Sequence, residues 1–364
     1  MNISPPRIAI VGLGNCASTL VQGLTFYRRT RETIGLMHPL IAGLAVGDIQ
    51  IACAFEVDSR KIGRPVREAI FAKPNNSRIF EPHPEDNDAK VYPGPLADGV
   101  AAHLRDTQNS QHVDVHSAAG NTPLEHVVDI LKSTNATVLV NYLPVGSQQA
   151  TELYAHACIA AGIGMVNCIP VFIASNPVWA DKFAAAGLPL IGDDVKSQFG
   201  ATIVHRQLMT IAQDRGIHVD TSYQLNVGGN NDFQNMLERG RLASKKTSKT
   251  EAVTSLVKGG MADDSIHIGP SDYVPFLHDN KICYIRINAR GFGGLPMELD
   301  LKLSVEDSPN SAGIVVDAVR CAHLAAQRRQ GGVLSPVSAA LMKHPPRQMP
   351  DSDAAAAMEA WINT

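Results

Sequence analysis

The sequence lacks the cysteine pairs that build disulfide frameworks or structural zinc sites. Its cysteines, at positions 16, 53, 158, 168, 283 and 321, are scattered and form no C-x-x-C pair. Cysteines distributed in this way are typical of proteins in a reducing compartment. We therefore expect neither a disulfide nor a structural zinc ion, and we expect the protein to be cytoplasmic.

Long apolar runs and an excess of one charge are also missing. No run approaches the roughly 18 apolar residues that a membrane-spanning helix needs. The N-terminus passes into a strand pattern without the layout of a signal or transit peptide. The formal net charge is −3, so the chain as a whole has no electrostatic attraction for nucleic acid. We expect neither a membrane nor a nucleic acid as a partner.

The common motifs of zinc enzymes and serine hydrolases are absent too. No H-E-x-x-H or H-x-H spacing is present, and no G-x-S-x-G marks a serine nucleophile. His205, His267 and His278 are therefore interpreted as structural or surface groups rather than metal ligands. The sequence predicts no metal site, and a requirement for a divalent metal or a monovalent cation stays open.

What the sequence does contain, through about residue 200, is a regular alternation of strand and helix patterns. The apolar, β-branched run at 7–12 ends in glycine and predicts a buried parallel strand. A helical pattern follows, then a second strand at 49–58 and further helix–strand pairs up to 189–194. This alternation is typical of a doubly wound parallel sheet of the Rossmann type. The segment 73–112, rich in Pro, Asn, Asp and Gly, is predicted to be an irregular excursion over the surface.

The pattern changes beyond residue 200. After a helix predicted at 204–215, strand patterns predominate, which predicts a mixed or antiparallel sheet and hence a second domain. A long helical pattern at 311–329 is expected to return and pack on the first domain. The predicted fold class is therefore α/β, a Rossmann-type doubly wound parallel sheet with an inserted α+β domain. The four strands are predicted at 219–227, 265–271, 281–290 and 297–305.

A glycine loop, G-L-G-N-C-A, lies between the first strand and its helix at 12–17. Gly12 permits a tight turn, Gly14 lets the backbone approach a pyrophosphate, and Ala17 fills the third position of the dinucleotide fingerprint. The N-terminus of the following helix supplies free N–H groups and a partial positive charge. Placed between a strand and a helix, the loop favours a dinucleotide site over a structural turn.

A carboxylate that ends the second strand is the usual partner of the adenosine ribose. Glu56 and Asp58 both occur there, although they lie beyond the usual offset of about 20 residues. The intervening segment 30–48 reads as an insertion that explains the delay. A carboxylate at this place favours NAD over NADP, because the extra phosphate of NADP calls for an arginine.

Two polar turns carry lysines that could bind an anion. G-D-D-V-K-S at 192–197 and N-V-G-G-N-N-D at 226–232 offer small residues and polar side chains beside predicted strand ends, which suits a phosphorylated sugar. Lys245 and Lys249 are four residues apart and would share a helix face, at a cost of roughly 0.2–0.5 kcal/mol for like charges. Taken singly, each of these lysines is more often a solvated surface group than a ligand.

Several long collinear blocks carry a resemblance to a known family. They include VGLGNCASTLVQG near the N-terminus, IGDDVKSQFGAT, QLNVGGNNDFQNMLE and SKKTSKTEAVTS in the middle, and EDSPNSAGIVVDAVR and LMKHPP towards the C-terminus. Over nearly its whole length the chain resembles the prokaryotic, especially the actinobacterial, inositol-1-phosphate synthases. The resemblance implies a homotetramer and a redox-neutral cyclisation. In that reaction tightly bound NAD⁺ oxidises C5 of glucose 6-phosphate, the C6 enolate attacks the C1 aldehyde, and the hydride then returns.

By motif position, the essential lysines of the family fall on Lys245, Lys249, Lys281 and Lys343. The resemblance implies that Lys245 and Lys343 serve the C5 oxygen and the proton transfers, while Lys249 and Lys281 hold the phosphate and the C1 oxygen. The residues implied to orient the lysines or the nicotinamide are Asp194, Asp232 and Asp307. The predicted substrate contacts are Ser197, Asn226, Asn230, Asn231 and Lys196. The predicted cofactor contacts are Gly12, Gly14, Asn15, Cys16, Ala17, Glu56, Asp58 and Asp194.

The same resemblance divides the chain into three parts. Residues 1–200 are expected to form the NAD-binding domain, 201–306 to carry catalysis and oligomerisation, and 307–364 to return to the NAD-binding domain. Several positions depart from the pattern of a housekeeping member, and most of them lie near the expected pocket. These positions are Glu56, Asn231, His278, Asn280, Ile282 and Glu306.

These departures leave the substrate open. The same sequence of oxidation, enolisation, aldol closure and reduction acting on fructose 6-phosphate would close a five-membered ring, as in relatives that serve carbocyclic natural-product pathways. Two other classes are also considered. A plain sugar-phosphate dehydrogenase would consume free NAD⁺ stoichiometrically, and a catalytically inactive regulatory protein is disfavoured because all four implied lysines are present.

Overall fold

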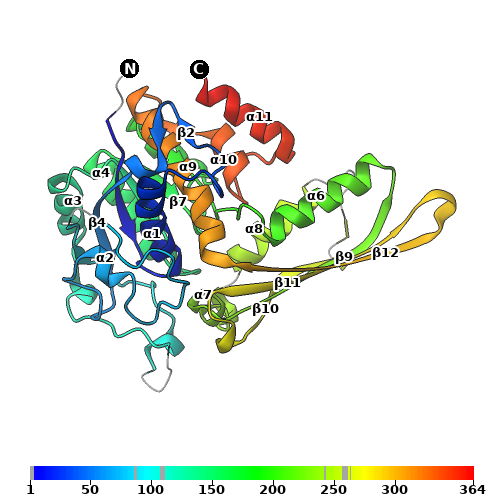
Figure 1. The fold of residues 1–364 in the computed structure, drawn as a ribbon, viewed down its shortest axis with the longest axis horizontal. Coiled ribbons are helices and arrows are strands. Elements are labelled where there is room, and N and C mark those ends of the chain that lie inside the picture. The colour runs from blue at the N-terminus through cyan, green and yellow to red at the C-terminus, as the bar shows by residue number, and fades with distance from the viewer. Residues whose placement is uncertain (1–3, 86–87, 107–110, 242, 256–260, 263) are drawn as a thin grey trace.

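The computed structural model describes residues 4–85, 88–106, 111–241, 243–255, 261–262 and 264–364. Two main sheets organise the molecule. A larger sheet with helices on both faces forms the body, and a smaller sheet extends from the body as an arm (Figure 1). None of the helices in the described residues is long and apolar enough to cross a bilayer.

The larger sheet has seven strands in the order β13-β8-β7-β6-β1-β4-β5. Every neighbouring pair is parallel, which confirms the predicted Rossmann-type doubly wound sheet. The strands are β1 (Arg7–Val11), β4 (Gln50–Glu56), β5 (Val91–Pro93), β6 (Val138–Asn141), β7 (Gly164–Asn167), β8 (Pro189–Ile191) and β13 (Gly332–Val333).

Both faces of this sheet are covered by helices, so its strands are apolar on both sides. In β1, Ile8 and Ile10 belong to the core on one face, while Ala9 and Val11 belong to the core on the other. The first core is completed by α1 (Asn15–Thr30), α9 (Asp307–Gln327) and α10 (Ser335–Leu341). The second core is completed by α3 (Leu124–Ser133), α4 (Gln148–Ala161) and α5 (Pro177–Ala185).

The smaller sheet has four strands in the order β10-β9-β11-β12. It is mixed, as predicted, because β10 runs parallel to β9 while β11 runs antiparallel to both β9 and β12. The strands are β9 (His218–Gly228), β10 (Ile266–Tyr273), β11 (Asn280–Arg290) and β12 (Pro296–Glu306). The helices α6 (Ala201–Asp214) and α8 (Ala243–Thr254) cover one face, where Met209 and Val253 pack against Ile268 and Ile285.

The chain returns to the larger sheet immediately after β12. The helix α9 packs against α1, and β13 pairs with β8 at the sheet edge. The remaining elements are β2 (Leu40–Ile41) and β3 (Leu44–Ala45), a hairpin within the predicted insertion, and the helices α2 (Val66–Ala69), α7 (Asn231–Asn235) and α11 (Asp351–Ile362). The arm of Figure 1 is therefore inserted between two parts of one α/β body.

Candidate active site

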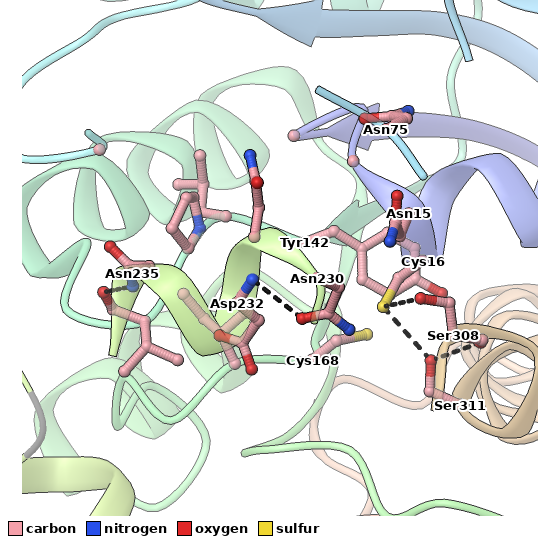
Figure 2. A pocket seen from close by; sticks show the side chains of 18 of the residues that line it. Asn15, Cys16, Asn75, Tyr142, Cys168, Asn230, Asp232, Asn235, Ser308 and Ser311 are labelled. Atoms are coloured by element: carbon pink, nitrogen blue, oxygen red, sulfur yellow. Dashed lines mark hydrogen bonds between the residues drawn. The ribbon is translucent and has the colours of Figure 1, made fainter. Parts of the chain in front are cut away.

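A cavity lies where the carboxyl ends of the parallel strands meet the turn after β9 and the start of β11. It brings together most of the residues predicted from the sequence, and Figure 2 shows several of them converging from separate segments. In a doubly wound sheet this edge is the place where ligands bind. The predicted residues that line it are Gly12, Gly14, Asn15, Cys16, Glu56, Asp58, Asp194, Ser197, Asn230, Asn231, Asp232, Lys281, Asp307 and Lys343.

The glycine loop has the geometry that a pyrophosphate needs. Gly12 adopts φ +80°, and a Cβ there would lie 2.7 Å from the backbone oxygen of Tyr142. A Cβ on Gly14 would meet no atom of the described residues within 4 Å, so the missing side chain leaves open space at the start of α1. Ala17 is fully buried in the core behind the loop and serves packing of the helix on the sheet rather than contact with the cavity.

The two carboxylates predicted to bind ribose have different surroundings. Glu56 ends β4 and accepts a hydrogen bond from the Leu13 N–H of the glycine loop (2.8 Å). The buried Lys61 ammonium lies 3.5 Å from the same carboxylate oxygen and donates to the Leu13 carbonyl (2.9 Å). Asp58 is 1% exposed and its carboxylate is held by the Arg60 guanidinium. Glu56 is therefore the better placed of the two for a ribose beside the loop.

Part of the predicted surface excursion closes the cavity instead. The segment 73–112 contributes β5 to the larger sheet, and its Val100 and Leu104 form a small apolar cluster with Val57 and Val113. All four side chains line the cavity. The expectation of a purely irregular excursion is thus wrong, because apolar residues spaced within it fold back beside Glu56. They form a surface suited to a flat apolar ring such as adenine.

Two ammonium–carboxylate pairs form the opposite wall. Lys281, on β11, lies 3.1 Å from Asp307 at the start of α9. Burial lowers the pKa of Lys281, but Asp307 and Asp232 more than offset this and the net pKa is raised. Lys281 therefore keeps its positive charge and suits an anionic oxygen rather than the role of a neutral base.

The second pair joins the C-terminal segment to the turn after β8. The Lys343 ammonium lies 2.8 Å from Oδ1 of Asp194, and the Lys343 N–H donates to the Asp194 carbonyl. The other carboxylate oxygen of Asp194 accepts from the Ser248 hydroxyl of α8 (2.6 Å). Asp194 thus connects α8, the turn at 192–197 and the segment that carries Lys343.

The helix α8 carries two of the predicted lysines. Lys245 and Lys249 lie on this helix, as expected, but their side chains are outside the described part of the structure. Ser248, which lies between the two lysines in sequence, is fully buried against Asp194. The helix that carries both lysines therefore contacts the wall of the cavity.

Two predicted substrate contacts are not brought to the cavity. The Lys196 ammonium is buried and donates to the carbonyl of Ala339 (2.8 Å) and to Asp351 (3.0 Å). Burial lowers the pKa of Lys196 to about 8. Asn226 lies inside the smaller sheet and donates to the Gly269 carbonyl (2.7 Å). The prediction for Lys196 is corrected, because a polar side chain beside a strand end can turn into the protein as well as towards a ligand. Asn226 is not among the described residues that line the cavity, and its contact with substrate stays a prediction.

The structure also adds residues that the sequence did not single out. Tyr142 follows β6 at the ligand-binding edge, which is a signal that could have identified it. Its hydroxyl, like the Asn231 side-chain oxygen, is buried without a hydrogen-bond partner among the described residues. Asn75 and Lys61 carry no motif and come from the irregular segment after β4. The serines of α9 that line the cavity, Ser308 and Ser311, bond the Cys16 thiol (Figure 2).

Comparison with known proteins decides the family. A model for myo-inositol-1-phosphate synthase matches residues 200–308. The inositol-3-phosphate synthase of Mycolicibacterium smegmatis is 50% identical over 364 residues, covering 98% of this chain and 97% of that protein. The chain belongs to the inositol-phosphate synthase family. The same family name is carried by a Corynebacterium glutamicum protein that is 48% identical over 100% of this chain and 99% of its own length.

Solved structures agree with the fold of this chain. The crystal structure of Ari2 is 30% identical, covers 99% of this chain and 100% of its own, and superposes with a TM-score of 0.77. The inositol-3-phosphate synthase of Caenorhabditis elegans is only 16% identical, but it has the same fold (TM-score 0.78, covering 99% and 86%). Because its relatives of about 50% identity over nearly the full chain are inositol-3-phosphate synthases, the protein is an enzyme of the inositol-phosphate-synthase type. Among the described residues, no group of three or more His, Cys, Asp or Glu side chains is arranged to hold a metal ion.

Proposed function

We propose that this enzyme converts D-glucose 6-phosphate to inositol 1-phosphate by an NAD-dependent, redox-neutral cyclisation. The observation that carries the proposal is that one cavity joins a glycine loop and Glu56 to the pairs Lys281–Asp307 and Lys343–Asp194. A wall of the kind that binds a dinucleotide in dehydrogenases thus faces a wall that carries two ammonium groups, each paired with a carboxylate. The relatives named inositol-3-phosphate synthase, whose sequences are 48% and 50% identical to this one over nearly the full chain, support the same activity.

The residues of the first wall fit a dinucleotide. The open space at Gly14 and the N-terminus of α1 suit the pyrophosphate, Glu56 suits the adenosine ribose, and Val100 and Leu104 suit the adenine. When bound, NAD⁺ would take a hydride from C5 of the sugar and return it after ring closure. The Tyr142 hydroxyl, which has no hydrogen-bond partner in the described part of the chain, is available for this cofactor at the ligand-binding edge.

The residues of the second wall would carry out the proton transfers and bind the phosphate and the C1 oxygen. The C5 hydroxyl proton and then a C6 proton must leave, the C1 oxygen must gain a proton once the C6–C1 bond has formed, and the C5 oxygen must regain a proton when the hydride returns. We assign these transfers to Lys343, held by Asp194, and to Lys245 of α8, which lies three residues before Ser248. Lys281, with its raised pKa, and Lys249 would hold the phosphate and the C1 oxygen.

Product analysis tests this proposal. The enzyme is incubated with NAD⁺ and glucose 6-phosphate while absorbance at 340 nm is followed, and the product is identified by NMR. We expect a six-membered cyclitol phosphate and no accumulation of NADH, because the hydride is returned in each turnover. Sustained NADH release would instead identify a simple dehydrogenase.

One observation favours a second candidate, cyclisation of fructose 6-phosphate to a five-membered cyclitol phosphate. That product has the same number of hydroxyl groups as the six-membered product, but it retains C1 as a hydroxymethyl branch, which places one hydroxyl donor outside the ring. The Asn231 oxygen is a buried acceptor without a partner among the described residues, at one of the positions that depart from the family pattern. NMR of the fructose 6-phosphate reaction would show the five-membered ring, and unchanged fructose 6-phosphate would remove this candidate.

We further propose that residues 201–306 carry assembly into a homotetramer as well as catalysis. On the face of the smaller sheet opposite α6 and α8, Tyr223 and Tyr284 are 36% and 43% exposed. In the turn between β11 and β12, Phe292 is fully exposed and Leu295 is 69% exposed. Apolar surface of this kind is typical of an interface between subunits. Light scattering after size exclusion should give four times the chain mass, and a monomeric mass would contradict the proposal.

A further inference from the structure

Asp279 occupies a junction between the two walls of the cavity. It immediately precedes β11 and is 1% exposed. Its Oδ1 accepts hydrogen bonds from Asn15 Nδ2 (3.0 Å), Asn230 Nδ2 (3.1 Å) and the Ser308 hydroxyl (2.8 Å). Its Oδ2 accepts from the Ser308 N–H (3.2 Å). Figure 2 labels these three partners, Asn15, Asn230 and Ser308, which come from three separate segments.

Each partner of Asp279 belongs to an element that contacts ligand in the proposed function. Asn15 is the first residue of α1, directly after the glycine loop. Asn230 caps α7 by accepting from the N–H groups of Asp232 (3.1 Å) and Phe233 (3.2 Å). Ser308 is the second residue of α9, and the carbonyl of Asp279 accepts from the N–H of its neighbour Asp307 (3.0 Å).

A second link closes the same junction. Asn15 also donates to the Asn76 side chain (2.6 Å), and Asn76 donates to the Gly229 carbonyl (3.0 Å). The turn at 229–232 is therefore held from two directions, by Asp279 through Asn230 and by Asn76 through Gly229, and Asn15 bonds both Asp279 and Asn76. Asp279 supplies the only charge among these side chains. A buried carboxylate is costly to desolvate and is retained where several donors satisfy it together.

We propose that Asp279 is a positioning residue that holds the turn at 229–232 and the start of α9 against the glycine loop. This arrangement would place the sugar phosphate at the correct distance and orientation for hydride transfer to the nicotinamide. The proposal rests on the proposed function. It requires the carboxylate form, because one carboxylate accepts from four donors here, whereas an amide presents an NH₂ group to at least one of them.

The charge state of Asp279 gives the proposal a measurable pH dependence. Burial, followed by the nearby carboxylate of Asp307, raises its pKa to about 6. Near this pH Lys281 stays protonated because its pKa is raised, and the Cys16 thiol stays neutral because burial raises its pKa to about 12. Protonation of Asp279 replaces an acceptor by a donor, so kcat/KM should fall below about pH 6.

The test compares Asp279→Asn with wild type and with Asp300→Asn, a control carboxylate that is largely exposed on β12. We expect kcat of Asp279→Asn to fall about 100-fold, as for a small misplacement of reacting groups, with the Kd for NAD⁺ changed less than threefold. The acid limb of the kcat/KM profile should disappear in this variant. Ser308→Ala, which removes one donor and folds with less disturbance, should lose about tenfold in kcat.

A readout without substrate separates this inference from the proposed function. Hydrogen exchange should accelerate at the Asp232 and Phe233 amides in Asp279→Asn, because their cap loses its anchor, while β6 keeps its protection. If wild type cyclises no hexose phosphate, the proposed function fails, and the exchange result still decides the positioning role. Unchanged exchange at α7, or loss of NAD⁺ binding in parallel with turnover, would overturn the inference.

Discussion

The two walls of the cavity are built in different ways. The wall formed by the glycine loop and Glu56 comes from one strand–turn–helix unit and the next strand, and it presents backbone groups and a carboxylate. The opposite wall is assembled from the turn at 192–197, α8, β11, the start of α9 and the segment around Lys343, and it presents ammonium–carboxylate pairs. We infer that changes in the first wall affect cofactor binding, whereas changes in the second affect turnover.

The largest effect is expected for Lys343→Met in the second wall. This change removes the cation that faces Asp194 and leaves a carboxylate that is 3% exposed without it. Turnover should fall about 1,000-fold, within the range for loss of a proton-transfer group, while NAD⁺ still binds. Turnover is measured by product formation and binding by fluorescence titration. The exposed Lys182→Met serves as control, and retention of more than a tenth of the activity would remove Lys343 from the mechanism.

The sharpest change in the first wall is Gly12→Ala. The new Cβ would lie 2.7 Å from the Tyr142 backbone oxygen at φ +80°, so the loop must move. We expect about 100-fold weaker binding of NAD⁺ and a loss of about 2 kcal/mol in the free energy of unfolding. Calorimetric titration and denaturant unfolding measure both.

The matched control for Gly12→Ala lies on the helix that follows the loop. A Cβ on Gly23 of α1 meets no described atom within 4 Å. Gly23→Ala should therefore raise stability by about 0.5–1 kcal/mol and leave cofactor binding unchanged. Equal loss of NAD⁺ affinity in both variants would contradict the contrast between the walls.

A third prediction concerns the buried cluster that supports the second wall from behind. Asp351 accepts from Lys196 (3.0 Å) and from Arg206 (2.8 Å), and Arg206 also donates to the Ala252 carbonyl of α8. Asp351→Asn leaves two buried cations without their counter-charge and should cost about 3 kcal/mol of stability. It should also lower kcat about tenfold, because the cluster fixes both α8 and the segment that carries Lys343.

The pH dependence of stability checks this third prediction. Burial raises the pKa of Asp351, but Lys196 and Arg206 outweigh it, and the net pKa lies below the ordinary value of 3.8. Its stabilising contribution is therefore fully present above pH 3.8 and is lost as the pH falls through the lowered pKa. Thermal melts in acid should show this loss in wild type but not in Asp351→Asn. Parallel melting curves would show that Asp351 is not ionised in the cluster.

The same contrast explains what the sequence could and could not predict. The glycine loop and Glu56 lie in elements whose periodicity and spacing are local, so both the strands and the meeting of the loop with Glu56 at one edge of the sheet were predictable. Lys196 was misassigned because its neighbours in sequence, Asp194 and Ser197, face the cavity, while the partners that turn its own side chain inwards lie 143 to 155 residues away. Asp279 was missed for the same reason, since its importance comes from Asn15, Asn230 and Ser308 together.

The smallest effect is expected for Glu56→Gln in the first wall. The amide can still accept the Leu13 N–H bond (2.8 Å), so the loop should keep its conformation. The charge-assisted bond to ribose and the attraction to Lys61 are weakened, and the bond that the other carboxylate oxygen accepts from the Val57 N–H (2.8 Å) is lost, which together correspond to about tenfold in the Kd for NAD⁺. NADP⁺ binding should weaken less or improve, because the carboxylate repels the 2′-phosphate. Titration with both cofactors measures this ratio. An unchanged ratio would mean that the carboxylate serves the glycine loop alone, and that the first wall selects its cofactor by backbone shape.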